Sequence, residues 1–476
     1  MKILLIEADF IREVGQKESC FVKLSAPALG VNYLASILRN QGHKVIVLDS
    51  FYEYLRTNFT SPIDIVKGTI AILEQEEDIE CVGISITSPT RNYALNIARQ
   101  IKSYNPEIKV IGGGPHITIL QELFLEKFSK FFDFLVIGEG DKTLPELISA
   151  LDGKTSMSEI AGIIYSDSRG GIKKSNPRSI LSEHELNNFD TVPFTDYKQY
   201  QKFLPDGIIP SVPLVTTRGC PYHCAFCCSP RLWGKYRKLS SERVLAEIGH
   251  LIEKYKVRNI RFQDDTFTFD KNRCLKILEG ITIKKWNIEL YMHTRFDCID
   301  EDIVEAYVKA GGKDIYFGLE SGSQPLRMAM DKNHVANKEI LEICRTVKNY
   351  GINLGLWLIF GYPGETDEDI QMTYNLVSEI QPHEVNCNPA HVHPYTPLFY
   401  QAEKEGIYRI EDWLNNAEDF FPYFKDERGA KAYQTCTLFA NHFSKTRIRA
   451  ILEKCFETTL GRNCYESAGK KLKLHS

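Results

Sequence analysis

The sequence lacks the features of a nucleic-acid-binding or membrane-spanning protein. Its 58 basic residues are outnumbered by 62 acidic ones. They form no cluster except the short tail of Lys470, Lys471 and Lys473, so nucleic acid is not expected as the main substrate. No uncharged apolar run is long enough to span a bilayer. The segment Met1–Asp9 turns acidic too soon for a signal peptide and is typical of a first β-strand.

Cysteine is present, but not in the pattern of a disulfide framework. The 13 cysteines are an odd number and are scattered through 476 residues. This usage indicates reduced thiols and predicts a cytoplasmic protein. Hydrophobic residues make up 43% of the chain and aromatic residues 11%, enough for folded cores. A chain of this length is expected to contain two or three domains.

Short apolar runs alternate with amphipathic segments in residues 1–152. The predicted strands are Lys2–Ala8, His43–Asp49, Cys81–Thr87, Ile108–Gly112 and Phe134–Gly138. Strands that are so continuously apolar form parallel sheets covered by helices on both faces. We therefore predict a doubly wound, Rossmann-like α/β domain, with its ligand at the carboxyl ends of the strands.

A second series of strands and helices is predicted beyond residue 205. Residues 153–205 are interpreted as a linker that contains one β-hairpin, Gly162–Lys173. The strands predicted in residues 206–398 are Leu214–Arg218, Asn259–Asp264, Glu289–Thr294, Asp314–Leu319, Asn353–Phe360 and Glu384–Val392. Six units predict a partial (β/α)6 barrel, with its catalytic groups at the carboxyl ends of the strands. Residues 399–476 are rich in aromatic residues, from Trp413 to Phe443, and predict a helical C-terminal domain packed on the barrel.

Three cysteines, Cys220, Cys224 and Cys227, follow the first strand of the predicted barrel and are called here the three-cysteine motif. A 4Fe–4S cluster normally takes four cysteines, so three leave one iron open to bind a small molecule. A zinc site that also uses His223 is the alternative. Against zinc, His223 directly precedes Cys224, whereas structural zinc sites usually pair two separated knuckles. Cys228 is expected to point elsewhere.

Polar residues and glycines follow the other predicted strands of the barrel. Asp265 follows the second strand, Arg295 the third, Glu320 the fourth and Gly361–Thr366 the fifth. A carboxylate such as Asp265 or Glu320 can accept hydrogen bonds from an ammonium or a ribose hydroxyl, and Arg295 can bind a carboxylate through two hydrogen bonds. The alternative for Arg295 and Glu320 is a structural ion pair in the mouth of the barrel.

The three-cysteine motif, with its Cys-x3-Cys-x2-Cys spacing and aromatic Phe226, resembles that of the radical SAM superfamily. Gly318–Ser323 and Gly355–Thr366 resemble the family's fourth- and fifth-strand motifs. The resemblance implies a 4Fe–4S cluster on the three cysteines, whose open iron binds S-adenosylmethionine (SAM) and cleaves it reductively to a 5′-deoxyadenosyl radical. The residues implied to contact SAM are Phe226, Asp265, Arg295, Glu320, Ser321, Gly361 and Pro363.

Small residues follow the later strands of the first domain, and no Gly-x-Gly-x-x-Gly follows the first strand, which disfavours a dinucleotide. Small residues let a large flat ligand approach the backbone. The pattern resembles the cobalamin-binding domain that precedes many radical SAM domains. The residues implied to contact cobalamin are Pro27, Leu29, Gly30, Ser85, Thr87, Ser88, Gly113, Gly114, Pro115, His116, Gly138, Glu139 and Gly140.

One segment departs from the cobalamin pattern. Many cobalamin proteins carry Asp-x-His-x-x-Gly, whose histidine ligates cobalt, but Asp9–Gly15 contains no histidine. The resemblance then implies base-off cobalamin without a His axial ligand, an arrangement that favours methyl transfer. His116 is expected to contact the corrin or the nucleotide tail rather than cobalt.

The resemblance covers nearly the whole chain and implies a cobalamin-dependent radical SAM enzyme that methylates an unactivated carbon through methylcobalamin. The implied partners are a small-molecule or peptide substrate and an electron donor such as flavodoxin or ferredoxin. Two alternatives stay open. One is a cyclase-type radical SAM enzyme that forms or rearranges rings without methyl transfer. The other is a non-catalytic corrinoid or iron–sulfur binding protein.

Overall fold

The computed structural model describes residues 1–8, 27–49, 62–76, 78–88, 90–167, 169–202, 207, 209, 211–332, 335–406 and 409–415. The sequence-predicted loop 9–15 and the aromatic residues beyond 415 therefore lie outside the described residues. Within the described ranges, no helix is both long and apolar enough to cross a bilayer.

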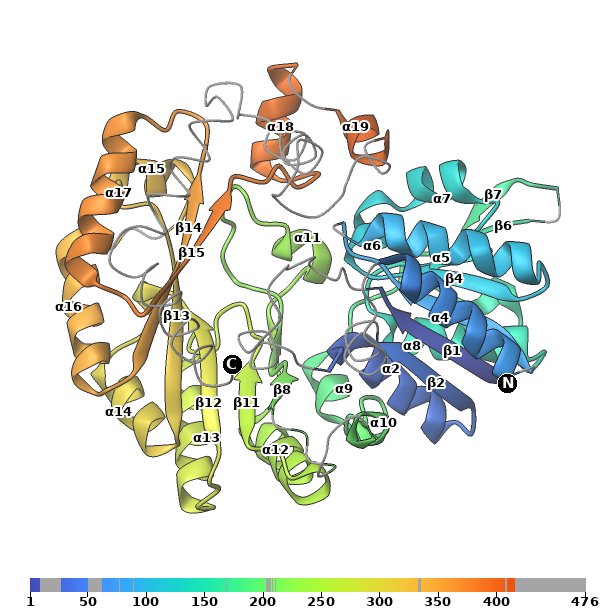
Figure 1. The fold of residues 1–476 in the computed structure, drawn as a ribbon, viewed down its shortest axis with the longest axis horizontal. Helices are drawn as coiled ribbons and strands as arrows, with labels where there is room; N and C mark the ends of the chain where they lie inside the picture. The colour runs from blue at the N-terminus through green and yellow to red at the C-terminus, as the bar shows by residue number, and fades with distance from the viewer. Residues whose placement is uncertain are drawn as a thin grey trace, which may run out of the picture.

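The first domain is built on a seven-stranded sheet of order β2-β1-β3-β4-β5-β6-β7. Its five parallel strands confirm the doubly wound prediction, and they are β1 (Lys2–Glu7), β2 (Lys44–Asp49), β3 (Ile79–Ser85), β4 (Lys109–Gly113) and β5 (Phe134–Val136). The helices of this domain are α2 (Leu29–Asn40), α4 (Pro62–Gln75), α5 (Arg91–Tyr104), α6 (Pro115–Leu120), α7 (Glu122–Phe128) and α8 (Gly140–Leu151). They cover both faces of the sheet (Figure 1).

The two faces of this sheet contribute to separate hydrophobic cores. Successive side chains of a strand point to opposite faces. Ile3 and Leu5 of β1 pack in the core that includes residues of α2 and α8. Leu4 and Ile6 pack in the core that includes residues of α5 and α7. This burial on both sides explains why the strands are almost continuously apolar in the sequence.

The predicted hairpin is present and extends the first sheet. Its strands β6 (Ile163–Ser166) and β7 (Ile172–Lys174) are antiparallel, and β6 pairs with β5. The segment interpreted as a linker therefore adds two strands to the first domain. The remaining helices of this segment are a 3₁₀ turn at Met157–Glu159, α9 (Glu183–Asn187) and α10 (Lys198–Gln201).

The second domain is an open sheet of six parallel strands in the order β15-β14-β13-β12-β11-β8, which confirms the partial barrel. The strands are β8 (Ser211–Leu214), β11 (Asn259–Phe262), β12 (Glu289–Thr294), β13 (Gly312–Glu320), β14 (Asn353–Phe360) and β15 (Glu384–Pro389). Its helices are α12 (Ser241–Tyr255), α13 (Lys271–Ile283), α14 (Glu301–Lys309), α15 (Gln324–Ala329), α16 (Asn337–Asn349) and α17 (Asp367–Ile380), with a 3₁₀ turn at Phe296–Cys298. β8 ends earlier than predicted, because Thr217–Arg218 forms a separate strand, β9, antiparallel to β10 (Arg237–Lys238).

Contacts of the first domain with the rest of the chain include two helical parts (Figure 1). One is α11 (Ser229–Trp233), which follows the three-cysteine motif and contacts α6. The other contains α18 (Pro397–Lys404) and α19 (Ile410–Asn415), which contribute to the same hydrophobic core as β1 and β3. These helices confirm a helical start to the C-terminal region. Trp413 packs in that shared core, and not only on the barrel as predicted.

Candidate functional site

The three-cysteine motif lines a cavity of about 430 Å³ at the carboxyl ends of the barrel strands, called here the cluster cavity. A glycine allows the chain to enter this loop. Gly219 has φ +83°, and a Cβ on it would lie 2.9 Å from the Lys235 carbonyl oxygen. The Ala225 N–H donates to the Met330 carbonyl at 2.8 Å, and the Leu398 N–H donates to the Ala225 carbonyl at 3.0 Å. The segment after α15 and the start of the C-terminal region thus hold the cysteine loop.

Hydrogen-bond donors face the sulfurs of Cys224 and Cys227. The Ser229 N–H, at the start of α11, donates to Cys227 Sγ at 3.4 Å. Arg295 Nη1 donates to Cys224 Sγ at 3.7 Å. Donors of this kind tune an iron–sulfur cluster, so the loop fits the cluster implied by its spacing.

Burial raises the pKa of all three thiols, and that of Cys227 to about 12. At Cys224, the positive charges of Lys332 and Arg295 oppose the effect of burial. Iron takes cysteine as thiolate. A bound cluster would therefore replace the three thiol protons and supply the positive charge that the buried thiolates need.

The zinc alternative finds no support in the geometry. His223 is exposed and does not line the cluster cavity. Across the described ranges, no three His, Cys, Asp or Glu side chains are grouped as a single ion requires. Cys228 does not line the cavity either, as predicted.

The carboxylates after β11 have different roles. Asp265 lines the cluster cavity, and its Oδ2 accepts a hydrogen bond from Ser229 Oγ at 2.5 Å. Asp264 also reaches the cavity, but it accepts the backbone N–H groups of Thr216 and Thr217 at 2.6 and 2.7 Å. Asp264 thus fixes the chain between β8 and β9, and Asp265 has more freedom to meet a ligand.

Arg295 lines the cluster cavity, but its carboxylate-binding face is occupied. Nε and Nη2 each donate to a different oxygen of Asp297 at 2.8 Å. The guanidinium also lies 3.6 Å from the ring centre of Tyr222. The alternative of an ion pair between Arg295 and Glu320 is wrong, because each has another partner. Asp297, only two residues away, holds Arg295 beside Cys224.

Glu320 pairs with Lys332 at 3.0 Å, and both side chains are almost buried. Glu320 adopts φ +64°, in the left-handed region that non-glycine residues rarely occupy. A Cβ on Gly318 would lie 2.5 Å from Glu320 Oε1 and 2.7 Å from Lys332 Nζ. Gly318 therefore makes room for the ion pair. Sequence reasoning missed Lys332, which belongs to no recognisable motif.

Of the predicted SAM contacts, Phe226, Asp265, Arg295 and Glu320 line the cluster cavity, but Ser321, Gly361 and Pro363 do not. Ser321 is fully buried against Thr373, with the two hydroxyls 3.2 Å apart. The Gly361 N–H donates to Glu365 at 2.5 Å. The unpredicted members of the wall are Gln263, Asp264, Thr266, His293, Thr294, Tyr316, Gly318, Lys332, Trp357, Ile359, Asn388, His391 and His393. Period-two alternation along the strands is the signal that could have identified His293, Tyr316 and Trp357.

A second cavity of about 380 Å³ lies at the carboxyl ends of the first domain's strands and is called here the corrinoid cavity. The predicted residues that line it are Leu29, Gly30, Ser85, Gly113, Gly114, Pro115, Gly138, Glu139 and Gly140. Pro27, Thr87, Ser88 and His116 were predicted too, but they do not line it. The second domain contributes unpredicted wall residues, Val215, Arg218, Leu232 and Trp233.

The structure does not place His116 on the wall of the corrinoid cavity. Its ring is buried edge-on against Phe124, and Nδ1 lies 3.1 Å from Ser88 Oγ. Burial lowers the pKa of His116 to about 3, so the ring is neutral. Directly after Gly114-Pro115, this side chain packs into the core of α6 and α7 instead of entering the loop cavity.

The corrinoid cavity fits a large flat ligand. Its floor is aliphatic, with Leu5, Ile111 and Val136. A Cβ on Gly30 or Gly138 would meet nothing within 4 Å, so these glycines leave open space above the backbone. Apart from Glu139, Asp141 and Arg218, which pair with one another, such a wall offers shape and main-chain groups.

Comparisons with known proteins agree with both cavities. The model of the radical SAM superfamily matches residues 214–377, and the model of the B12 binding domain matches residues 22–148. The chain belongs to the cobalamin-dependent radical SAM enzymes. An uncharacterized methyltransferase of Pyrococcus horikoshii is 29% identical over 420 residues, which cover 87% of this chain and 85% of the relative.

Other relatives of this radical SAM enzyme differ in their named reactions. Cytidylyl-2-hydroxyethylphosphonate methyltransferase of Streptomyces wedmorensis is 25% identical, over 74% of this chain and 73% of the relative. An anaerobic magnesium-protoporphyrin IX monomethyl ester cyclase of Rubrivivax gelatinosus is 24% identical, over 81% and 68%. The solved structure of the radical SAM methyltransferase TsrM from Kitasatospora setae has a TM-score of 0.68 at 16% identity, over 85% of this chain and 75% of TsrM. It confirms the fold.

Proposed function

We propose that this radical SAM enzyme methylates an unactivated carbon of its substrate by way of cobalamin. One observation carries the proposal: a single short stretch of chain borders both cavities. Cys220, Cys224 and Cys227 line the cluster cavity, whereas Leu232 and Trp233, within six residues of the last cysteine along the chain, line the corrinoid cavity. Groups bound in the two cavities would thus be neighbours, as a methyl transfer requires.

When bound, a 4Fe–4S cluster with SAM supplies radical chemistry and cobalamin supplies a methyl carrier. The chain's own residues bind and orient these groups. The three thiolates would hold the cluster, with Ser229 N–H and Arg295 donating to two of the sulfurs. Asp265 and the Glu320–Lys332 pair would present charges of both signs to the zwitterionic end of SAM.

We further propose that cobalamin is held base-off, without a histidine ligand to cobalt. The described wall of the corrinoid cavity contains no histidine, and His116 is buried elsewhere. A small-molecule substrate is favoured, since TsrM has been solved with tryptophan as substrate, and a peptide is the alternative. The reaction needs a reducing electron, for which a flavodoxin or ferredoxin in the cytoplasm is the proposed source.

The second candidate function is a ring-forming or rearranging reaction without methyl transfer, and the named cyclase relatives favour it. The experiment that separates the two uses methyl-deuterated SAM. The reconstituted protein is incubated anaerobically with a reductant and a small-molecule extract, and products are analysed by mass spectrometry. Label in a new product supports methylation, and a new product without label supports cyclisation. The Cys224→Ala variant is the control, and if wild-type protein forms no 5′-deoxyadenosine, both enzyme proposals fail.

A further inference from the structure

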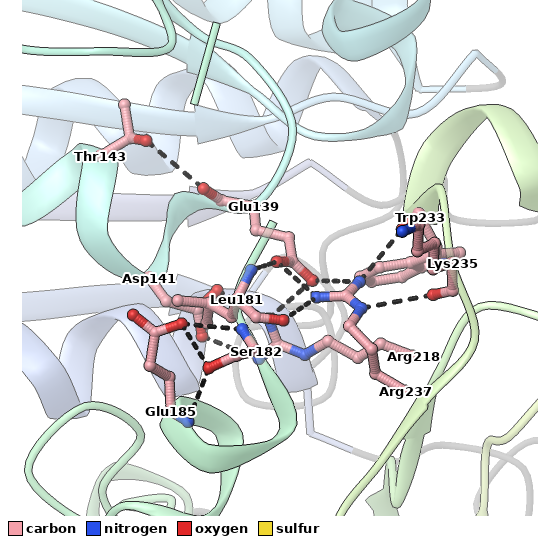
Figure 2. A network of polar contacts seen from close by, with 10 residues as sticks. All are labelled: Glu139, Asp141, Thr143, Leu181, Ser182, Glu185, Arg218, Trp233, Lys235 and Arg237. Carbon is pink, nitrogen blue, oxygen red and sulfur yellow. Dashed lines mark hydrogen bonds and ion pairs between the residues drawn. The ribbon is translucent and has the colours of Figure 1, made fainter. Parts of the chain in front are cut away.

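A buried network of four charged side chains crosses the boundary between the two domains (Figure 2). Glu139 and Asp141 come from the start of α8 in the first domain, and Arg218 and Arg237 come from β9 and β10 in the second. Their side chains are only 6–12% exposed. Two positive and two negative charges thus neutralise one another away from water.

Each arginine of this network has more than one partner. Arg218 donates to both oxygens of Asp141 at 2.8 and 2.9 Å, and it lies 3.1 Å from Glu139. Arg237 contacts both oxygens of Glu139 at 2.8 and 2.9 Å. It also donates to the carbonyls of Leu181 and Trp233 at 2.8 and 3.1 Å. Planar guanidinium groups suit such bridging, which lysine cannot reproduce.

The charges in this network depend on one another. Burial alone would raise the pKa of Asp141, but the charge and hydrogen bonds of Arg218 lower it below its usual value. Burial alone would lower the pKa of Arg218, but Asp141 and Glu139 raise it. Removing one member therefore leaves a buried charge without its partner, which is more costly than losing an exposed pair.

The network lies between the two candidate sites. Arg218, Glu139 and Asp141 all line the corrinoid cavity. Arg218 is separated from Cys220 only by Gly219, whose backbone is packed against the Lys235 carbonyl. Arg237 donates a hydrogen bond to the carbonyl of Trp233, another wall residue of the corrinoid cavity. In the antiparallel pair of β9 and β10, Arg237 lies directly opposite Arg218. A displacement of the Glu139 side chain would move Arg218, and Arg218 is joined to Cys220 through Gly219 alone.

We infer that Arg218 and Glu139 are positioning residues that fix the corrinoid cavity relative to the cysteine loop. They would thereby hold a bound corrinoid and a bound cluster at a constant distance from each other. This inference rests on the proposed function, because it assumes that both groups bind. It assigns the residues no contact with SAM or substrate. The network is built from segments that lie far apart in the sequence, and no motif contains it.

The first test measures binding and not activity. Hydroxocobalamin is titrated onto the cluster-reconstituted full chain, and binding is followed by tryptophan fluorescence. We expect Arg218→Met and the isosteric Glu139→Gln each to raise Kd at least tenfold, with iron per chain unchanged. Lys142→Met is the matched control, because it breaks an ion pair between α8 and Glu185. Neither Lys142 nor Glu185 lines the corrinoid cavity, so the Kd for hydroxocobalamin should change less than twofold.

The second test measures the separation itself. With cobalamin and cluster both reduced to paramagnetic states, pulsed electron paramagnetic resonance gives the distance distribution between them. Wild type and Lys142→Met should give one narrow distribution, and Glu139→Gln a broader one. Unchanged Kd and an unchanged distribution in both Arg218→Met and Glu139→Gln would overturn the inference. So would a loss of iron parallel to the loss of cobalamin, since the network would then only support the fold. Failure of methyl transfer alone would refute the proposed function and leave these readouts intact.

Discussion

The corrinoid cavity and the cluster cavity border the same stretch of chain and have similar volumes, about 380 and 430 Å³, but their walls differ in chemistry. The corrinoid cavity is lined by glycines and aliphatic side chains, and its charged residues are paired with one another. The cluster cavity is lined by thiols, carboxylates, imidazoles and two cations. We therefore expect the first cavity to recognise its ligand by shape and backbone groups, and the second by individual side chains.

This difference explains how each site can be damaged. A site built from individual side chains is lost when one of its ligands is removed. A site in which glycines leave space for a ligand is lost when a side chain fills that space. The substitutions below test this contrast, beginning with the largest expected effect.

Removal of one cysteine should abolish the cluster cavity's chemistry. Cys224→Ala leaves two thiolates, too few to hold a cluster with one open iron. We expect bound iron to fall to background and 5′-deoxyadenosine formation to fall at least about a thousandfold, equivalent to about 4 kcal/mol of activation free energy. Iron analysis and chromatography measure both. Cys228→Ala is the matched control, because Cys228 lies outside the cavity wall. Retention of full activity by Cys224→Ala would refute the cluster assignment.

The Glu320–Lys332 pair allows the cluster cavity's electrostatics to be tested separately from its cysteines. Lys332→Met leaves Glu320 charged and almost buried, which should cost about 3 kcal/mol of unfolding free energy in the apo protein. The double variant Lys332→Met/Glu320→Gln should recover most of this loss. Urea unfolding followed by circular dichroism measures both. Lys271→Met, which breaks exposed ion pairs, should change little. Equal losses in the single and double variants would contradict a coupled pair.

The corrinoid cavity should be closed by adding a side chain. A Cβ on Gly113 would lie 4.0 Å from its nearest neighbour, so the backbone accepts it and a larger side chain would project into the cavity. We expect Gly113→Leu to raise the Kd for hydroxocobalamin about 100-fold, or about 2.7 kcal/mol, with bound iron unchanged. Gly113→Ala should have a much smaller effect. If Gly113→Leu binds hydroxocobalamin normally, the corrinoid lies elsewhere.

The contrast between the cavities also decides what the sequence could predict. The three-cysteine motif is contiguous, so its spacing alone identifies the three thiols. The glycine loops follow predicted strands, and the strand order brings most of them to one edge. Lys332 and Trp233 could not be predicted, because tertiary packing alone brings them to the cavities. Ser321 does not line the cluster cavity because the chain turns at Glu320, whose φ is +64°, and the Ser321 hydroxyl lies against Thr373 in the helix behind.

Glu365 tests the region behind the cluster cavity, next to Gly361 and Pro363, which the resemblance implies as SAM contacts and which do not line that cavity. The Gly361 N–H donates to one oxygen of Glu365, and the other is buried without a hydrogen-bond partner among the described residues. Burial raises the pKa of Glu365 from 4.5 to about 7. The folded state therefore binds this proton more tightly than the unfolded state, and stability falls as pH rises from 4.5 to 7.

Glu365→Gln removes this titration and keeps an acceptor for Gly361. Wild type and variant should have similar stability near pH 4.5, and the variant should be more stable by about 3 kcal/mol above pH 7. Thermal unfolding of the apo protein across this pH range measures the difference. Exposed Glu368→Gln serves as the control and should follow wild type throughout. If the stability of wild type and of Glu365→Gln changed with pH in the same way, Glu365 would ionise without loss of stability. The region behind the cluster cavity would then be as polar as the cavity wall.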